Sequence, residues 1–248
     1  MRYAVIADIH ANLEALTEVL NFLEKEKIDQ YLCLGDIVGY GADPGECLKI
    51  VRQLPNCTVI AGNHDYGAAD KTDLSNFSIY ALEAVMWTRE QLSEEELNYL
   101  GRLPLVENLD NITIVHSSLN KPKKWQYVKS LEEAYFSFFY LNKNICFMGH
   151  SHRPYIFSCH DGEYDDFIPE EVFVMDQESK YLINAGSVGQ PRDGIWQAAC
   201  CIYDDKEKIV KIKRIPYDVA RTQQKIIKAD LPEYLATRLK PKEDDESI

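Results

Sequence analysis

Histidine, aspartate and asparagine residues recur in this sequence directly after short apolar runs. The residues of this kind that could bind a metal are Asp8, His10, Asp36, Asn63, His64, His116, His150 and His152. Asp8 and His10 are separated by one residue, as are His150 and His152, so on extended backbone the members of each pair point to the same side. Imidazole and carboxylate groups are common ligands of transition metals. A lone histidine is usually structural, but eight metal-capable residues in equivalent positions predict a metal centre.

Glycine residues precede two of these candidates and leave room around them. Gly35 comes directly before Asp36, so the Asp36 carboxylate could approach closely enough to bridge two cations. In the run 62–65 (G-N-H-D), Asn63 offers a neutral oxygen ligand beside His64, whose imidazole is free for acid–base catalysis.

The first part of the chain alternates short apolar runs with amphipathic stretches, which predicts β-α-β units. We expect strands at residues 3–7, 31–34, 57–61, 112–115 and 145–148, and helices at about 12–27, 45–54 and 131–141. Crossovers of this length imply parallel pairing in a sheet covered by helices. Because ligands bind at the carboxyl edge of parallel strands, the candidate residues are expected to meet at that edge.

Later segments show a different pattern. Residues 75–102 look helical, with a capping box between Ser93 and Glu96. After His152, short runs at 155–157, 172–174, 181–183, 198–203 and 209–215 predict a second, largely antiparallel sheet. We expect one domain over residues 1–248, with a helical insert at about 66–102 and a charged tail at about 240–248.

Composition excludes several classes of protein. The net charge of −13 argues against binding of long nucleic acids, which require a basic surface. The apolar run before Asp8 is too short for a signal-peptide core, and no run approaches a membrane span, so we expect a cytoplasmic protein that binds no membrane. The seven cysteines include no C-x-x-C pair and are predicted to be reduced structural thiols. The oligomeric state is not indicated.

The order of the motifs is typical of one superfamily. D-x-H, G-D-x-x-G, G-N-H-D, a single strand-end histidine and G-H-x-H follow one another between residue 1 and about residue 203. This set resembles the calcineurin-like metallophosphoesterase superfamily. Residues 184–194 resemble the N-x-G-S-x-x-x-P-R segment of its small bacterial and archaeal phosphoesterase branch. The resemblance implies an α/β fold of four layers, an α-β-β-α sandwich.

The resemblance also implies a dinuclear metal site and a catalytic histidine. The implied ligands form two sets with one shared carboxylate: Asp8, His10 and His152 for one ion, Asn63, His116 and His150 for the other, and Asp36 as the bridge. His64 would not ligate a metal but would stabilise or protonate the leaving oxygen.

Two cations about 3.5–4 Å apart can clamp the attacking and leaving oxygens of a displacement at phosphorus. A hydroxide that both metals share is a nucleophile available at neutral pH. Mixed imidazole and carboxylate ligands suit Mn, Fe, Zn, Ni or Co better than Mg, which prefers oxygen ligands. The sequence therefore predicts two divalent ions from this group.

The chain departs from the serine/threonine protein phosphatases of the superfamily, which carry G-D-x-V-D-R-G. Gly39 and Tyr40 stand where those enzymes have an aspartate and an arginine, which disfavours a phosphoprotein substrate. Arg192 is the remaining candidate for gripping phosphate, unless it pairs with Asp193. Asn12 and Asn63 are further candidates for substrate contact, although an N-cap role explains Asn12 fully.

The loop at 117–128 combines basic and aromatic residues, namely Lys121, Lys123, Lys124, Trp125 and Tyr127. It could hold a nucleotide by charge and stacking, or it could be a solvated turn. We expect an enzyme that hydrolyses a small, nucleotide-like phosphodiester or phosphomonoester. The alternatives are a non-catalytic interaction scaffold on the same fold, which loss of ligands would favour, and a phosphoprotein phosphatase.

Overall fold

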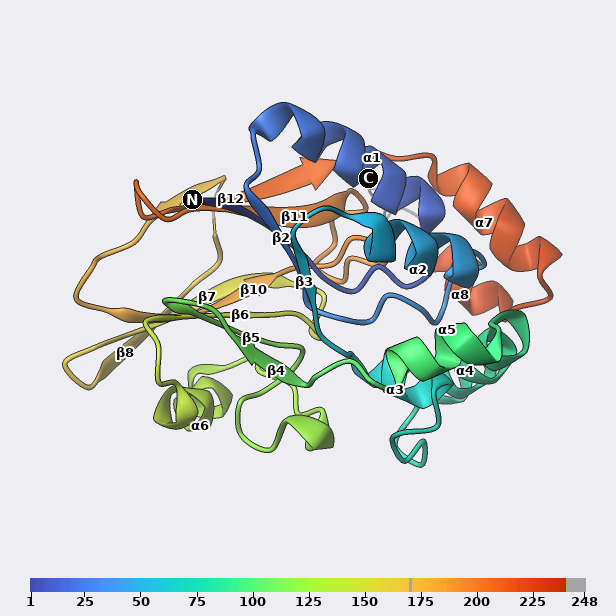
Figure 1. Cartoon of the computed structure of the whole chain (residues 1–248), viewed down its shortest axis with the longest axis horizontal. Helices are drawn as coiled ribbons and strands as arrows, with labels where there is room; N and C mark the ends of the chain where they lie inside the picture. The colour runs from blue at the N-terminus through green and yellow to red at the C-terminus, as the bar shows by residue number, and fades with distance from the viewer. Residues whose placement is uncertain (170, 240–248) are drawn as a thin grey trace, which may run out of the picture.

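The computed structural model describes residues 1–169 and 171–239, which form two six-stranded mixed sheets with helices on their outer faces (Figure 1). The first sheet has the order β3 (Cys57–Val59), β2 (Gln30–Cys33), β1 (Arg2–Ile6), β11 (Ala198–Asp204), β12 (Ile209–Ile215) and β9 (Val172–Val174). The second has the order β4 (Val106–Asn108), β5 (Ile112–Val115), β6 (Ile145–Met148), β10 (Lys180–Ala185), β7 (Pro154–His160) and β8 (Glu163–Phe167).

The expected parallel pairing of the first three strands is confirmed, since β1, β2 and β3 are parallel. The expected separate antiparallel sheet after His152 is wrong. Its strands are divided between the two sheets: β11 pairs antiparallel with β1, while β10 pairs parallel with β6. Apolar periodicity identifies a buried strand but does not say which sheet it joins.

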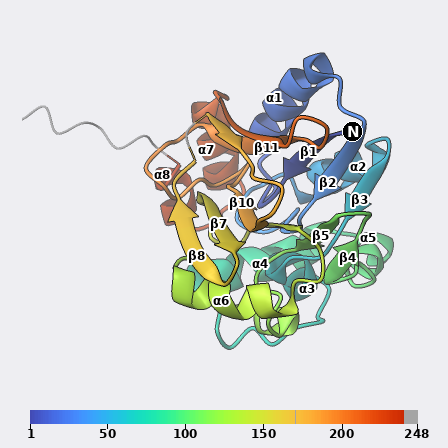
Figure 2. The same cartoon turned by 90° about the vertical axis from the view of Figure 1, so that its left-hand side faces the viewer.

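The helices complete four layers, so the predicted α-β-β-α sandwich is confirmed. The helices are α1 (Leu13–Leu23), α2 (Pro44–Gln53), α3 (Asn63–Ala68), α4 (Ile79–Gln91), α5 (Glu94–Leu100), α6 (Leu131–Tyr140), α7 (Val219–Lys228) and α8 (Glu233–Thr237). Figure 2 shows α1 and α6 on opposite sides of the paired sheets.

The core follows these layers. Apolar residues of both sheets meet between them, among them Val5, Phe147 and Tyr203. A second cluster joins α1 and α2 to the first sheet, and a third joins α6 to the second sheet. Burial of the inner face of each sheet and one stripe of each helix accounts for the layered arrangement.

Helices α4, α7 and α8 pack together near Tyr40, in a cluster that includes Ala81, Ile226 and Leu235. The capping box of α5 is confirmed by the hydrogen bonds between Ser93 and Glu96. The predicted charged tail at 240–248 lies outside the described residues. No helix within residues 1–169 and 171–239 is both long and apolar enough to cross a membrane.

Candidate metal centre

The candidate ligands lie at strand ends, but they come from both sheets instead of from one edge of a single sheet. Asp8, Asp36 and Asn63 follow β1, β2 and β3 of the first sheet. His116 and His150 follow β5 and β6 of the second sheet. Because the sheets stack face to face, the ends of both contribute to one site.

The backbone at these positions is unusual. Positive φ angles occur at Asp8 (52°), His10 (50°), Asp36 (51°), His150 (65°) and His152 (59°). This left-handed conformation costs a residue with a Cβ atom roughly 1–2 kcal/mol. Such strain persists where the surrounding structure over-determines it and is common at functional sites. All five side chains are buried within four residues of the end of a strand.

The first group of donors is formed by Asp8, His10 and His152, all buried, whose ligand atoms lie within 4.8 Å of one another. The Nε2 atoms of His10 and His152 are 3.1 Å apart. Oδ1 of Asp8 lies 3.4 Å from Nε2 of His152. Three donor atoms therefore converge on one point, as a bound cation requires.

The second group is formed by Asp36, His116 and His150, also within 4.8 Å of one another. Nε2 of His116 lies 3.2 Å from Nδ1 of His150 and 3.3 Å from Oδ1 of Asn63. One oxygen of Asp36, Oδ2, is 3.2 Å from Nε2 of His116 and 3.7 Å from Nε2 of His10. This oxygen faces both groups, the position that a bridging ligand needs.

Backbone carbonyls orient all four of these imidazoles. In each ring the nitrogen that points away from the cluster lies 2.6–3.2 Å from a carbonyl oxygen: His10 Nδ1 from Val38, His116 Nδ1 from Leu34, His150 Nε2 from Trp125 and His152 Nδ1 from Gln190. A carbonyl only accepts, so that nitrogen is the donor and the other nitrogen of a neutral ring offers its lone pair inward. Metal-ligating histidines are usually held this way. The donor set thus fits divalent cations.

The pKa shifts of the buried histidines and carboxylates also fit a cation site. Burial lowers the pKa of His10, His150 and His152 well below the ordinary value, which keeps their rings neutral. Burial also raises the pKa of Asp8 to about 7. For His116, burial lowers the pKa, but the Asp36 carboxylate overcomes this effect and raises it to about 9. The carboxylates therefore require positive charge here, which protons or metal cations can supply.

His64 is the second residue of α3 and lies beside both groups. A ring nitrogen lies within 4.8 Å of the donor atoms of His10 and Asp36, and its buried Nδ1 has no hydrogen-bond partner among the described residues. Burial lowers the pKa of His64 to about 4, so its ring is neutral. Gly39, with φ +87°, packs against it: a Cβ atom there would lie 2.4 Å from Nδ1 of His64. The glycine that replaces the family's aspartate thus makes room for this ring.

Asp65 holds the loops around His64 in place. Its Oδ2 accepts a hydrogen bond from the Gly62 amide (2.9 Å), and its Oδ1 accepts one from the Ile37 amide (2.9 Å). In turn, the His64 amide donates to Oδ1 of Asp36 (2.7 Å). These bonds tie the end of β2 to the start of α3, so the bridging carboxylate and His64 are positioned together.

The metal centre opens into a cavity of about 470 Å³. Asp36, Asn63, His64, His150 and His152 form its floor. Lys123, Lys124, Trp125 and Tyr127 line it, so this part of the loop at 117–128 faces the site, while Lys123, Lys124 and Tyr127 also remain exposed to solvent. Tyr127 stacks on His150 with ring centroids 4.1 Å apart. Lys121, also considered from sequence, is not among the lining residues.

The candidate substrate residues have different surroundings. Arg192 lines the cavity, and Asp193 pairs with Arg214 instead of with Arg192. Asn12 caps α1 by accepting from the Ala15 amide (3.1 Å) and donates to the Gly189 carbonyl (2.9 Å). The structure therefore gives Asn12 the cap role and leaves it out of the cavity lining.

Sequence reasoning did not single out several residues of the cavity, among them Tyr40 and Arg238. The Tyr40 ring packs against the His64 ring, with centroids 4.4 Å apart and planes tilted by 50°, and its replacement of the protein phosphatases' arginine was the only signal. Arg238, just after α8, also lines the cavity. An arginine in a last helical turn is ordinary, so nothing in the sequence singled it out.

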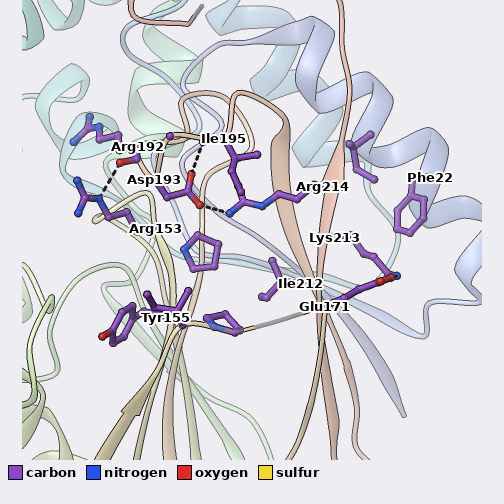
Figure 3. A pocket seen from close by; sticks show the side chains of 15 residues that line it. Phe22, Arg153, Tyr155, Glu171, Arg192, Asp193, Ile195, Ile212, Lys213 and Arg214 are labelled. Atoms are coloured by element: carbon purple, nitrogen blue, oxygen red, sulfur yellow. Dashed lines mark hydrogen bonds and ion pairs between the residues drawn. The ribbon is translucent and has the colours of Figure 1, made fainter. Parts of the chain in front are cut away.

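A larger cavity, of about 1080 Å³, lies beside β12 and β7 (Figure 3). Its charged residues are mostly paired: Arg214 with Asp193, and Lys213 with Glu171. Arg153 donates from Nε to the Arg192 carbonyl (2.9 Å). None of the candidate metal ligands lines this cavity.

Comparisons with known proteins agree with this geometry. The chain is 43% identical over 240 residues to an uncharacterized protein of Methanocaldococcus jannaschii, covering 95% of this chain and 96% of that protein. It is 29% identical over 131 residues to the symmetrical bis(5'-nucleosyl)-tetraphosphatase of Erwinia tasmaniensis, covering 49% of this chain and 45% of that protein. The crystal structure of a metallophosphoesterase from Sphaerobacter thermophilus is similar, with a TM-score of 0.83, 37% identity and coverage of 96% and 98%.

The family model of the calcineurin-like phosphoesterase superfamily domain matches residues 1–208. This range contains every candidate metal ligand, His64 and Arg192. The chain therefore belongs to the calcineurin-like phosphoesterase superfamily and is a metallophosphoesterase.

Proposed function

We propose that the protein hydrolyses a small, nucleotide-like phosphoester with the help of two divalent cations. The observation that carries this proposal is the pair of donor groups that share the Asp36 carboxylate. Asp8, His10 and His152 would hold one cation, Asn63, His116 and His150 the other, and Asp36 both. When bound, the cations would polarise the phosphoryl group and lower the pKa of water at the site.

Side chains of the protein supply the other contributions to hydrolysis. Hydrolysis breaks the bond between phosphorus and the leaving oxygen, forms one between phosphorus and a water oxygen, and moves a proton to the leaving oxygen. His64, neutral and beside Asp36, stabilises that oxygen with a hydrogen bond from its ring N–H, while the proton itself comes from the attacking water. Arg192 lines the same cavity and binds a phosphate oxygen of the substrate. Asp65 and Gly39 keep the His64 ring in position.

A nucleotide-like substrate is supported by the walls of the cavity. Trp125 offers an aromatic ring, Lys123 and Lys124 offer positive charge, and the Tyr127 ring is stacked on His150 with the Lys129 ammonium over it. Stacking and charge together are how proteins hold nucleotides without reading their sequence. The similarity to a bis(5'-nucleosyl)-tetraphosphatase over about half the chain agrees with this substrate class.

Chelation tests the function. Activity on bis(4-nitrophenyl) phosphate should disappear after treatment with EDTA and return with Mn²⁺, because the nucleophile depends on bound cations. Asp36→Asn is the matched variant, and Mn²⁺ should restore little of its activity. Full activity of rigorously metal-free protein would exclude the mechanism. Elemental analysis of the loaded protein identifies the preferred metal among Mn, Fe, Zn, Ni and Co.

A substrate panel then narrows the class. It should compare cyclic nucleotides, dinucleoside polyphosphates, nucleoside monophosphates, sugar phosphates and a phosphopeptide. We expect the highest kcat/KM for a nucleotide, since the aromatic walls favour a base. A preference for the phosphopeptide would instead support a protein phosphatase, and a protein that binds metal but hydrolyses none of them would support a scaffold.

A further inference from the structure

Two arginine side chains face the metal-centre cavity without a carboxylate partner among the described residues. Arg192 follows β10, and Arg238 follows α8, so distant segments bring them to one wall. Within residues 1–169 and 171–239, no carboxylate oxygen lies within ion-pair distance of either guanidinium group. This differs from Arg214 in the larger cavity, which pairs with Asp193.

Neutral groups hold these two arginines in place. Arg192 donates from Nη2 to Oε1 of Gln190 (2.9 Å) and to the Tyr40 hydroxyl (3.4 Å). Its guanidinium carbon lies 5.8 Å from the centre of the Tyr40 ring, and that of Arg238 lies 5.2 Å from the centre of the Tyr234 ring. Tyrosine rings and amide oxygens orient a guanidinium group but do not neutralise its charge.

The two arginines form a path that leads away from the metals. Burial, followed by the nearby charge of Arg192, lowers the pKa of Arg238. Both arginines line the metal-centre cavity and the cavity next to it, and an anion between the two guanidinium groups would relieve their repulsion.

Space continues past the two arginines. A cavity of about 320 Å³ shares Arg192 and Arg238 with the metal-centre cavity and is also lined by Trp196, Tyr217 and Tyr234. A ligand longer than a single phosphate could thus extend from the metals, past both arginines, to this aromatic pocket. The shape and charge together fit an elongated anion.

We propose that Arg192 and Arg238 form a second phosphate subsite, which holds the phosphate next to the scissile one and selects substrates with two or more consecutive phosphates. This inference rests on the proposed function, since the metals must take the scissile phosphate. Guanidinium groups bind phosphate oxygens bidentately, and two of them match the charge of an oligophosphate chain. The substrate class is a nucleoside oligophosphate.

A comparison of two substrates tests selectivity. Diadenosine tetraphosphate has four consecutive phosphates, whereas thymidine 5'-(4-nitrophenyl phosphate) has one. Arg238→Gln should lower kcat/KM for the first substrate about 10- to 100-fold more than for the second, which is the effect of a lost charged hydrogen bond. Arg238→Lys should lose less. Equal losses for both substrates would overturn the subsite and give Arg238 a structural role.

The matched control is Arg102→Gln, which removes one exposed arginine that lines none of the cavities described. It should leave kcat/KM unchanged for both substrates. Far-UV circular dichroism and thermal unfolding show whether Arg238→Gln keeps α8 folded. Arg192→Gln provides a second variant of the subsite that does not alter that helix.

A binding measurement separates this inference from the proposed function. Inorganic tripolyphosphate is titrated calorimetrically into the metal-free protein, so no turnover is needed. Arg192→Gln and Arg238→Gln should each weaken its Kd about 10-fold relative to Arg102→Gln. An unchanged Kd would overturn the subsite even in an active enzyme. Weakened binding in a protein that hydrolyses neither substrate would support the subsite but contradict the hydrolase.

Discussion

The metal-centre cavity and the larger cavity of Figure 3 both contain basic side chains, but these differ in how far carboxylates neutralise their charge. In the larger cavity, Arg214 and Lys213 are neutralised by Asp193 and Glu171. In the smaller one, Arg238 and Arg192, which also lines the larger cavity, have no described carboxylate partner, and five buried candidate metal ligands have left-handed backbone. The metal-centre cavity therefore differs from the larger cavity in its uncompensated charge and its strained backbone more than in its volume.

The largest effect expected at the metal-centre cavity comes from His64→Ala. Both metals should remain bound while kcat falls about 10²- to 10⁴-fold, the usual contribution of acid–base help. His160→Ala is the matched control, because His160 ends β7 with a side chain that is 52% exposed. Metal content by elemental analysis and kcat are measured on the same samples. Loss of a metal from His64→Ala would make His64 a ligand.

A smaller effect is expected from the aromatic wall. Trp125→Ala should lower kcat/KM for a nucleotide ester about 10-fold, since stacking of a base contributes about 1–3 kcal/mol. His150 should keep its partner, because it bonds to the backbone carbonyl of Trp125 and not to the side chain. Trp125→Phe should recover most of the activity. Identical kinetics for Trp125→Ala would mean that the ring does not contact the substrate.

The smallest effect on catalysis is expected in the larger cavity. Arg214→Gln should lower the free energy of unfolding by about 1–3 kcal/mol, because it leaves the partly buried Asp193 without its ion pair. Denaturant unfolding measures this loss, and kcat/KM should stay at the wild-type value. A fall in kcat/KM without a change in stability would show that the larger cavity also contacts the substrate, and the contrast between the cavities would be lost.

Much of the fold was predictable from apolar patterning. The strands at 112–115, 145–148 and 209–215 have the predicted bounds, as expected for runs buried on both faces or alternating clearly. Strand β8 was missed because its sequence, E-Y-D-D-F, is acidic and largely exposed at a sheet edge. Strand β4 was missed because its sequence, V-E-N, has only one apolar residue.

The candidate site was predictable as a set of residues but not as a geometry. Residue type and strand-end position identified Asp8, His10 and His116 as candidate ligands, and the structure places them together. Contacts made by the backbone carry no sequence signal, such as the carbonyl of Trp125 on His150. The position of Arg238 could not be predicted from the sequence for another reason. It depends on how α8 packs beside Tyr40, which is a tertiary effect.

The left-handed backbone at the ligands has a consequence for how such a protein can change over generations. Glycine adopts this conformation without penalty, so replacing Asp8 or His10 by glycine would abolish metal binding and relieve strain at once. Drift from enzyme to inert binding module is therefore thermodynamically easy in this architecture. Glycine at the ligand positions is the mark by which descendants that have lost catalysis should be recognised.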